Sequence, residues 1–573
     1  RLEPAFGEEE YSLTIQQEFI HIGASTPKAV YYALCTLTQL AWLNHGSLDC
    51  CAIHDSPTYA IRGFSDDISR GQISNLENFK SIIRRLAFYK CNVYMPYIED
   101  TFLFESIPES GKYSNPVGAQ EWRTLVTYAE NYFVRIVPII NLFAHWEKNA
   151  ALGAFRDFLL AKDNDPLWAH RGTLDVRKPE VRAMVQAILD EIVAVFGRSG
   201  IIHAGGDEVG ALELFSKEEA GEIYNDYYRF IRHELEVRGC RMMMYSDMYT
   251  PVYGDYQVPL DCMDEMPKDI QFVYWDYTPR HEYRNIDELV RRDRCFHVSP
   301  ASYTWNRFVP QLEVAWHNTR RIAGYAPDHC SGLIMSSWND GGMTLREENW
   351  FSVLIGASFG WHPGSRMTYT EYIEKFFDLY FGLKEIDLTP FNCLFGYGAS
   401  NPTTGIEGPE EDHDMERRLG LMLSTGEKLY VEFWKDARLP VDPEIKARTV
   451  ADLRNALSAL AYFNALKPLR NKETYDAMLF DMRRLTTAIR KVALLKDGAY
   501  LTREEAMKAI PDILEMAREV SALHEENDRL WHATNRRSEW DFCDYKYLEL
   551  EDSFHALARY CRVAKWMKAK KFL

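Results

Sequence analysis

Short apolar segments alternate with amphipathic helical stretches between about residue 59 and residue 363. The apolar segments that resemble strands are 60–64, 92–97, 134–141, 201–205, 242–245, 272–275, 295–299 and 333–336. Apolar residues recur at helical spacing between them, for example at 75–89, 120–133, 179–196 and 217–237. Eight such alternations over roughly 300 residues predict an α/β fold, the (β/α)8 TIM barrel. A doubly wound open sheet is the alternative, disfavoured because no G-x-G-x-x-G loop follows the first strand.

The two flanks of this region have different patterns. Residues 10–15 alternate as a strand, 21–24 could pair with them, and 27–43 carry apolar residues at helical spacing, which predicts a small α/β unit. Beyond about residue 365 strand patterns disappear, and helical patterns cover 450–467, 474–495 and 503–531. Residues 398–414, rich in Gly, Pro and acids, are typical of a loop. We therefore expect domains at 1–57 (small α/β), 58–365 (barrel) and 366–573 (all-α).

Charge and composition disfavour several classes of binding partner and cofactor. The 573 residues carry a formal net charge of −18, which argues against nucleic acid or an anionic membrane as partner. No apolar run approaches the ~18 residues of a membrane-spanning helix. The 11 cysteines include no CxxC pair and no metal-ligand spacing, so we expect reduced thiols, no metal and a cytoplasmic protein. The chain starts with Arg1 rather than Met, so a removed leader, and with it secretion, stays the alternative.

Two consecutive acids follow the fourth predicted strand. The stretch His203-Ala204-Gly205-Gly206-Asp207-Glu208 places them where the strand–helix loops of a barrel gather. Adjacent carboxylates repel each other, so the pKa of one should rise, which suits a general acid beside a charged partner. A helix N-cap followed by an acidic first turn would have the same sequence pattern. This stretch alone leaves both interpretations open.

Other predicted strands end in residues that suit sugar binding. Carboxylates, an arginine and aromatic rings at one mouth would hydrogen-bond hydroxyls and stack on a ring. Each has a structural alternative: an ion pair of Arg62 with Asp67, a buried histidine, or tryptophans of the core. Convergence on one face of a barrel favours a site. The candidates are Arg62, His145, Trp275, Tyr303, Trp305, Trp338 and Asp340.

These motifs resemble the β-N-acetylhexosaminidases of glycoside hydrolase family 20. His203-x-Gly205-Gly206-Asp207-Glu208 is similar to that family's H-x-G-G-D-E signature. Arg62-Gly63, followed by Asp67 and Arg70, is similar to its R-G-x-x-x-D-x-x-R motif, and Trp338-x-Asp340 to its W-x-E/D. The resemblance covers the N-terminal unit and the barrel. The third strand departs from the family's P-E-I-D-x-P-G-H, with Asn141 replacing an acid and Ala144 a glycine.

The resemblance implies an activity and a role for each matched residue. The chain would remove terminal β-linked N-acetylhexosamine with retention, the substrate's own acetamido oxygen attacking C1 to give an oxazolinium intermediate. Glu208 would be the general acid/base and Asp207 would hold the acetamido group. The other candidates would bind the sugar: Arg62 and Asp340 its hydroxyls, Trp338 the floor, and Trp275, Tyr303 and Trp305 the walls. His145 is a further substrate-binding candidate. No cofactor is implied.

Alternatives remain open at this point. A conventional retaining glycosidase would use a carboxylate nucleophile such as Asp276 or Asp340. A family variant could release a disaccharide or a sulfated N-acetylhexosamine, and a catalytically silent barrel could bind sugar without turnover. The sequence leaves open the choice between GlcNAc and GalNAc, the linkage and the aglycone. It also leaves open a homodimer and the role of the C-terminal helices.

Overall fold

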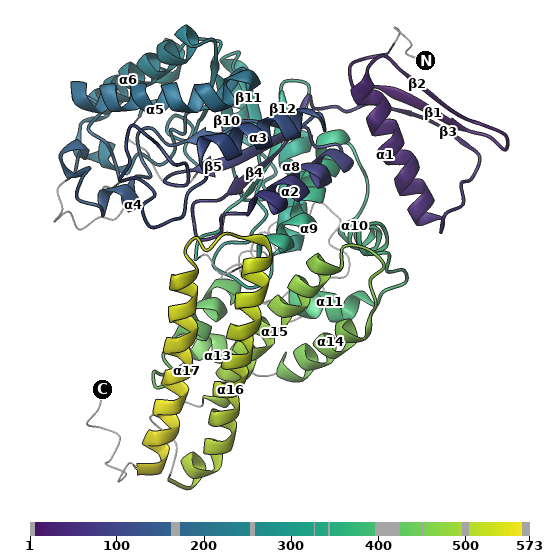
Figure 1. The fold of residues 1–573 in the computed structure, drawn as a ribbon, viewed down its shortest axis with the longest axis vertical. Helices are drawn as coiled ribbons and strands as arrows, with labels where there is room; N and C mark the ends of the chain where they lie inside the picture. Colours follow the sequence, from purple (N-terminus) through teal and green to yellow (C-terminus); the bar gives the residue numbers. More distant parts are fainter. Residues whose placement is uncertain are drawn as a thin grey trace.

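The structure is a computed structural model, and it describes residues 6–161, 172–252, 258–325, 327–341, 344–395, 425–449, 452–495 and 503–563. Figure 1 shows a barrel of strands and helices, with a small sheet unit to its right and a helical region below. The helical region ends in a long hairpin of two helices that extends away from the barrel. The loop expected at 398–414 lies outside the described residues.

The N-terminal unit is a three-stranded antiparallel sheet covered by one helix. Its strands are β1 (Tyr11–Ile15), β2 (Ile20–Ala24) and β3 (Cys51–Asp55), in the order β2-β1-β3, and its helix is α1 (Pro27–Leu43). Thr26 caps α1 by accepting a hydrogen bond from the Ala29 backbone, and Pro27 supplies the first turn. The first two strands and the helix match the prediction. The sequence pattern gave no sign of β3, an edge strand without a buried residue.

Eight parallel strand positions close into a barrel. The strands are β4 (Ile61–Asp67), β5 (Val93–Ile98), β6 (Arg135–Ile136) with β7 (Ile139–Ile140), β8 (Ile201–His203), β9 (Arg241–Tyr245), β10 (Gln271–Trp275), β11 (Cys295–Ser299) and β12 (Gly332–Ser337). Closure is complete because β4 pairs with both β5 and β12. The predicted barrel is confirmed. Its third strand is interrupted between β6 and β7, where Pro138 cannot donate a backbone hydrogen bond.

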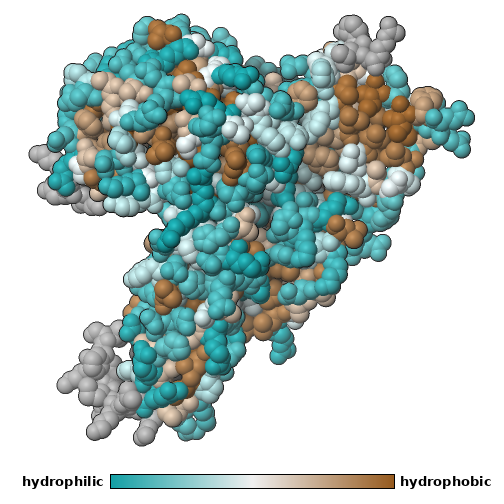
Figure 2. All heavy atoms as spheres, viewed as in Figure 1, coloured by the Kyte–Doolittle hydropathy of each residue, from teal (hydrophilic) through white to brown (hydrophobic). Residues whose placement is uncertain are grey.

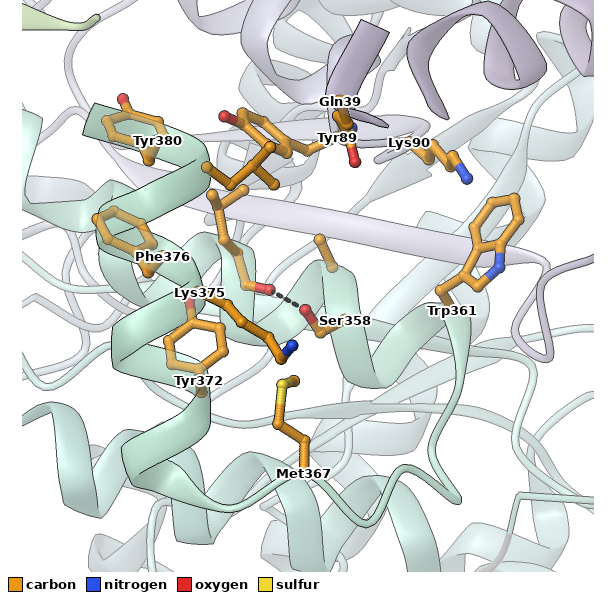
Figure 3. A pocket seen from close by; sticks show the side chains of 13 residues that line it. Gln39, Tyr89, Lys90, Ser358, Trp361, Met367, Tyr372, Lys375, Phe376 and Tyr380 are labelled. Carbon is orange, nitrogen blue, oxygen red and sulfur yellow. Dashed lines mark hydrogen bonds between the residues drawn. The ribbon is translucent and has the colours of Figure 1, made fainter. Parts of the chain in front are cut away.

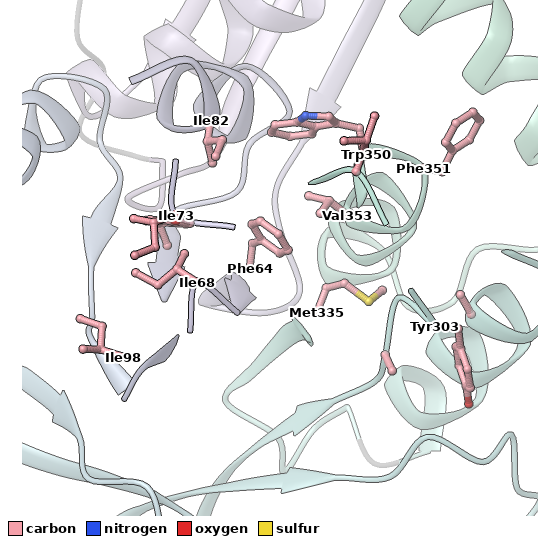
Figure 4. Packing of buried hydrophobic residues seen from close by; sticks show 14 of the residues in the cluster. Phe64, Ile68, Ile73, Ile82, Ile98, Tyr303, Met335, Trp350, Phe351 and Val353 are labelled. Atoms are coloured by element: carbon pink, nitrogen blue, oxygen red, sulfur yellow. The ribbon is translucent and has the colours of Figure 1, made fainter. Parts of the chain in front are cut away.

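Helices cover the outside of the barrel. They are α2 (Leu76–Phe88), α3 (Ala119–Glu130), α4 (Glu147–Ala150), α5 (Pro179–Phe196), α6 (Lys217–Val237), α7 (Arg284–Arg291), α8 (Leu312–Tyr325) and α9 (Asn349–Trp361). Short helical turns are η1 (Arg156–Phe158), η3 (Gly197–Ser199), η4 (Gly210–Leu214), η5 (Leu260–Glu265) and η6 (Arg346–Glu348). Outward-facing residues of the strands pack under the helices, as Phe64 and Met335 do near Ile82 and Val353 in Figure 4. A separate inner cluster, including Met95, Ile139 and Val273, fills the barrel.

All the regular elements in the described residues of the C-terminal part are helices. Its elements are α10 (Tyr369–Phe376), the π-helix η7 (Phe377–Phe381), α11 (Leu388–Phe395), α13 (Pro443–Thr449), α14 (Leu453–Ala465), α15 (Lys472–Leu494), α16 (Arg503–Thr534) and α17 (Trp540–Val563), with a further helical segment at 425–434. The turn between α16 and α17 lies against the first barrel loop, where Asn535 bridges to Ser74.

The surface carries both polar and apolar areas. On the face shown in Figure 2, most side chains are polar, and apolar ones gather over the N-terminal unit. Three large apolar residues of that unit, Phe19, Ile20 and Leu34, are exposed. A search of the described helices found none with the length and hydropathy needed to span a membrane.

Candidate active site

A cavity of about 420 Å³ opens at the carboxyl ends of the barrel strands, the end at which TIM barrels place their sites. Seven of the nine residues singled out from the sequence line it: Asp207, Glu208, His145, Trp275, Trp305, Trp338 and Asp340. Four further lining residues are Arg70, Tyr97, Tyr277 and Asn306. The strand ends therefore bring most of the predicted residues together.

The turn after β8 explains its two glycines. Gly205 and Gly206 have positive φ angles of 66° and 103°. A Cβ on Gly205 would lie 2.4 Å from Asn141 Oδ1, and one on Gly206 would lie 2.9 Å from the Tyr224 hydroxyl. Larger residues would therefore clash and strain the backbone. This tight turn delivers Asp207 and Glu208 into the cavity.

Glu208 itself has a strained backbone. Its φ is +48°, a region that non-glycine residues rarely adopt and that costs of order 1–3 kcal/mol. Two of the hydrogen bonds that hold the turn come from neighbouring elements: the Tyr224 hydroxyl donates to Gly206 O at 2.7 Å, and the Glu208 N–H donates to Asp247 Oδ2 at 3.0 Å. Asp247, at the end of β9, thus fixes the backbone of the second acid from behind.

His145 lies between the two acids. Its Nε2 is 3.2 Å from Asp207 Oδ2 and 3.8 Å from Glu208 Oε2. Burial acts to lower the His145 pKa, but the Asp207 carboxylate outweighs it and raises the pKa to about 10. In return, the imidazolium overcomes the effect of burial and lowers the pKa of Asp207. The pKa of Glu208 is raised by burial in the cavity and by Asp207, against the opposing charge of His145.

Arg70 contacts several acidic and aromatic side chains around the cavity. Its guanidinium contacts three carboxylates: Asp67 Oδ2 at 3.2 Å, Glu99 Oε1 at 3.1 Å and Asp340 Oδ1 at 3.4 Å. Burial raises the Glu99 pKa to about 7, against the charge of Arg70. Arg70 also lies over the Tyr97 and Trp338 rings, 5.2 and 5.5 Å from their centroids.

Aromatic rings form the remaining walls. The Trp275 and Tyr277 rings lie 5.1 Å apart, and Tyr277 lies 5.7 Å from Trp305. The Trp338 indole donates to the Tyr277 hydroxyl at 2.6 Å, and the Tyr97 ring meets Trp338 edge-on at 4.8 Å. These contacts hold the rings in fixed orientations, which suits stacking on the face of a sugar.

The placement of Arg62 corrects a prediction. Arg62 stands at the start of β4, whereas the cavity lies beyond the carboxyl ends of the strands. Its guanidinium is 1% exposed, pairs with Glu9 Oε2 at 2.6 Å, and donates to the carbonyls of Tyr59 and Lys90. It therefore joins the barrel to the N-terminal unit. The arginine that reaches the cavity is Arg70, eight positions later in the same motif.

Tyr303 is also displaced from its predicted place. It is 1% exposed and stacks behind Trp305, with ring centroids 5.0 Å apart, so it supports a wall residue and does not line the cavity. Two of the missed lining residues had a sequence signal: Arg70 belongs to the first-strand motif, and Tyr277 follows Trp275 by two positions. Tyr97 ends the second predicted strand, 92–97, but was not singled out there, and Asn306 follows Trp305 without a signal of its own.

A second cavity of about 300 Å³ lies between the helices shown in Figure 3. Aromatic and apolar side chains such as Tyr89, Tyr372 and Phe376 line it, with two lysines, Lys90 and Lys375. Its described lining contains no carboxylate, so it lacks the acid that cleavage of a glycosidic bond requires. No group of three or more His, Cys, Asp or Glu residues within the described ranges is arranged to hold a metal ion.

Comparison with known proteins shows which family the barrel resembles. Residues 59–236 match the model of the glycosyl hydrolase family 20 catalytic domain. A β-hexosaminidase of Emericella nidulans is 26% identical over 331 residues, 52% of this chain and 53% of that protein. A β-hexosaminidase of Vibrio furnissii is 23% identical over 388 residues, 56% of this chain and 61% of that protein. The chain thus spans between one half and two thirds of the length of these curated relatives.

Solved structures support the fold. A family 20 β-N-acetylhexosaminidase from Streptomyces coelicolor matches with a TM-score of 0.52 at 20% identity, covering 65% of this chain and 81% of that one. A family 20 exo-β-N-acetylglucosaminidase from Vibrio harveyi, solved in complex with N-acetylglucosamine, matches with a TM-score of 0.51 at 18% identity, covering 66% of this chain and 67% of that one. Residues 59–236 thus resemble the catalytic domain of glycosyl hydrolase family 20, and the solved structures share the fold of the barrel.

Proposed function

We propose that the chain is an exo-acting, retaining β-N-acetylhexosaminidase that works by substrate-assisted catalysis. The observation that carries the proposal is the pair Asp207 and Glu208, set side by side in the cavity with His145 against both. The pKa of Asp207 is lowered and that of Glu208 is raised. Two carboxyl groups with pKa values pushed apart suit an ionised group beside a general acid.

The cavity supports a single terminal sugar as substrate. Its volume of about 420 Å³ lies within the ordinary range of small-ligand pockets, and aromatic walls stand beside hydroxyl-binding acids. The relatives are named β-hexosaminidase and β-N-acetylhexosaminidase, which favours N-acetylhexosamine as that sugar. We propose that Trp338 and the neighbouring aromatic residues pack on the ring while Asp340 and Arg70 bind its hydroxyls.

The mechanism follows from the position of the acids. Conventional retaining glycosidases place two carboxyl groups on opposite sides of the bond, about 5–5.5 Å apart. Adjacent residues of one turn are poorly placed for that, so the nucleophile would be the acetamido oxygen of the substrate. An intramolecular nucleophile held in line gains several kcal/mol through effective molarity. Glu208 would protonate the leaving oxygen and then activate water to open the oxazolinium intermediate.

Asp207 is suited to hold the acetamido group. Its Oδ2 faces His145, while Oδ1 is buried and accepts no hydrogen bond from another residue in the described part of the chain. A buried acceptor without a donor is costly unless a ligand supplies one. The amide N–H of the substrate would be that donor, and the carboxylate would stabilise the positive charge that develops on the amide.

The structure fits some of the alternative mechanisms and substrates less well than others. Asp276 does not line the cavity and is held by Arg280 at 2.6 Å, which disfavours it as a nucleophile. A sulfated sugar needs a cation, but Arg70 and His145, the two cationic residues among the described lining residues, already face carboxylates. Asp340 as nucleophile and a silent sugar-binding barrel are left to experiment.

The test is an assay with 4-nitrophenyl N-acetyl-β-D-glucosaminide. We expect turnover by the wild type and a loss of about a hundredfold or more in kcat for Asp207→Asn and for Glu208→Gln. The exposed Glu218→Gln, in the first turn of α6, is the matched control and should behave as wild type. Brisk hydrolysis of the 4-nitrophenyl glucoside, which lacks the acetamido group, would contradict the substrate-assisted mechanism. An inert wild type would favour the silent barrel.

A further inference from the structure

Two loops form one wall of the cavity and are joined to each other. The loop after β11 carries Trp305 and Asn306, and the loop after β12 carries Trp338 and Asp340. The Thr304 hydroxyl donates to Trp338 O at 2.9 Å, and the Asn306 N–H donates to Asp340 O at 2.9 Å. These paired loops, residues 303–309 and 338–341, therefore move as one unit if either is displaced.

The helical segment 425–434 of the C-terminal region contacts the second of the paired loops next to Asp340. The Tyr430 hydroxyl donates to Gly341 O at 3.1 Å. Gly341 has a φ of +85°, and a Cβ there would lie 2.7 Å from the Tyr430 hydroxyl and 2.8 Å from Asn306 Oδ1. The peptide after Asp340 is thus enclosed between Tyr430 on one side and Asn306 on the other.

The same helical segment also holds the first of the paired loops. Arg307, 2% exposed, pairs through Nη2 with Glu427 Oε1 at 3.1 Å. The neighbouring Phe308 ring packs against Tyr430 and Phe433, with centroids 5.2 and 5.0 Å away. One ion pair, one hydrogen bond and an aromatic cluster therefore connect this single helical segment to both loops.

We propose that Tyr430 is a positioning residue for sugar binding, and that the C-terminal helical region holds the wall of Trp305, Asn306 and Asp340 in its binding conformation. The proposal rests on the proposed function, in which Asp340 binds a sugar hydroxyl. Tyr430 acts through Gly341 and Asn306 and does not itself line the cavity. Its contribution is to binding, because Asp207 and Glu208 are on the β8 turn, which helix 425–434 does not contact through these bonds.

The experiment compares two single-hydroxyl deletions in the full chain. Tyr430→Phe keeps the ring beside Phe308 and removes the hydroxyl that donates to Gly341. Tyr475→Phe is the matched control, because its buried hydroxyl donates to Phe463 O at 2.7 Å, within the helical region. KM and kcat are measured with 4-nitrophenyl N-acetyl-β-D-glucosaminide, and hydrogen–deuterium exchange is followed in the peptide that contains Asn306.

For Tyr430→Phe we expect KM to rise about three- to tenfold, as loss of one hydrogen bond implies, with kcat changed less than about twofold. Exchange in the Asn306 peptide should be faster than in wild type, and Tyr475→Phe should change neither readout. A KM and exchange rate equal to those of Tyr475→Phe would overturn the proposal, as would a fall in kcat at constant KM. If the wild type is inert, the proposed function fails, and the exchange rate alone decides for or against the positioning role.

Discussion

At the level of single residues, His145 is the cation that both pocket acids share. Its Nε2 lies 3.2 Å from Asp207 and 3.8 Å from Glu208, and its pKa is raised to about 10. The folded pKa lies above the unfolded value of about 6.5, so the stabilisation from protonated His145 is complete below about pH 6.5. It is lost as the pH rises towards 10. Over the neutral range His145 therefore acts as a fixed positive charge.

Replacing His145 by Asn should shift the pH dependence of catalysis. The positive charge lowers the pKa of both Asp207 and Glu208, so its removal raises both. The acidic limb of kcat/KM, set by ionisation of Asp207, and the alkaline limb, set by deprotonation of Glu208, should both move to higher pH. The profile is measured from about pH 3 to about pH 9, with exposed His54→Asn as control. Movement of one limb alone, or of neither, would contradict the shared-cation arrangement.

The two arginines of the first-strand motif show how far the sequence could locate the site. The motif identified the right strand, but Arg62 and Arg70 are eight positions apart, Arg62 at the start of β4 and Arg70 three residues beyond its end. The position of β4, Ile61–Asp67, is needed to see that Arg62 lies at the amino end of the strand. Arg70 lies beyond its carboxyl end, at the cavity. The seven lining residues that were predicted all lie at or just after the carboxyl ends of strands. The alternation of strands and helices in the sequence is enough to locate these ends.

At the level of elements, the end of β9 supports the turn after β8. Asp247 is 1% exposed, and its Oδ2 accepts the N–H of Glu208, whose φ is +48°. Burial and the nearby Asp207 raise the pKa of Asp247 well above its ordinary range, so its neutral form is favoured. The end of β9 thus supplies the acceptor that holds the catalytic turn, at a position where a second full charge is disfavoured.

Asp247→Asn and Asp247→Ala should therefore differ. Asparagine keeps a neutral acceptor of the same shape, and we expect kcat within a few-fold of wild type. Alanine leaves the Glu208 N–H without its partner in a strained turn, and kcat should fall about tenfold or more. Steady-state kinetics measure both, with circular dichroism to compare the folds. Equal losses in the two variants would show that Asp247 acts through its charge or through packing alone.

Other element boundaries were only partly readable from the sequence. The barrel strands are short apolar runs between turns and were located to within a few residues. The third was expected as one strand at 134–141, but Pro138 divides it into β6 and β7. Strand β3 was missed because its half-exposed residues lack an apolar alternation. Asn306 could not have been found, because the helical region that fixes its loop is remote in sequence.

At the level of the whole molecule, the helical region is tied to the barrel by a buried charged cluster. Arg484 and Asp481 on α15 form an ion pair with both side chains fully buried. Asp481 Oδ2 also accepts the Leu345 N–H at 3.4 Å, just beyond the Asp340 loop. Arg484 lies over the Phe308 ring at 5.2 Å. Barrel and helices therefore share buried contacts at the cavity wall.

Arg484→Met should destabilise the fold strongly. It leaves Asp481 buried without its cation, and breaking such a pair costs about 3–5 kcal/mol. Arg483→Met, on the same helix, removes a partly exposed pair with Glu526 and should cost less than about 1 kcal/mol. Urea unfolding followed by tryptophan fluorescence compares their midpoints. Similar midpoints for the two variants would mean that the buried pair contributes no more than a surface one.

The bridge between Asn535 and Ser74 has a consequence for the order of assembly. Backbone groups of residues 71–75 pair with residues 534–539: the Asn75 N–H donates to Thr534 O at 2.9 Å, and the Arg536 N–H donates to Ile73 O at 2.8 Å. Asn75 caps α2, and Arg70 precedes this segment. During synthesis on the ribosome, residues 71–75 therefore cannot form these hydrogen bonds until more than 450 further residues have been made. The loop that follows the pocket arginine is therefore completed only after residues 534–539 have been made.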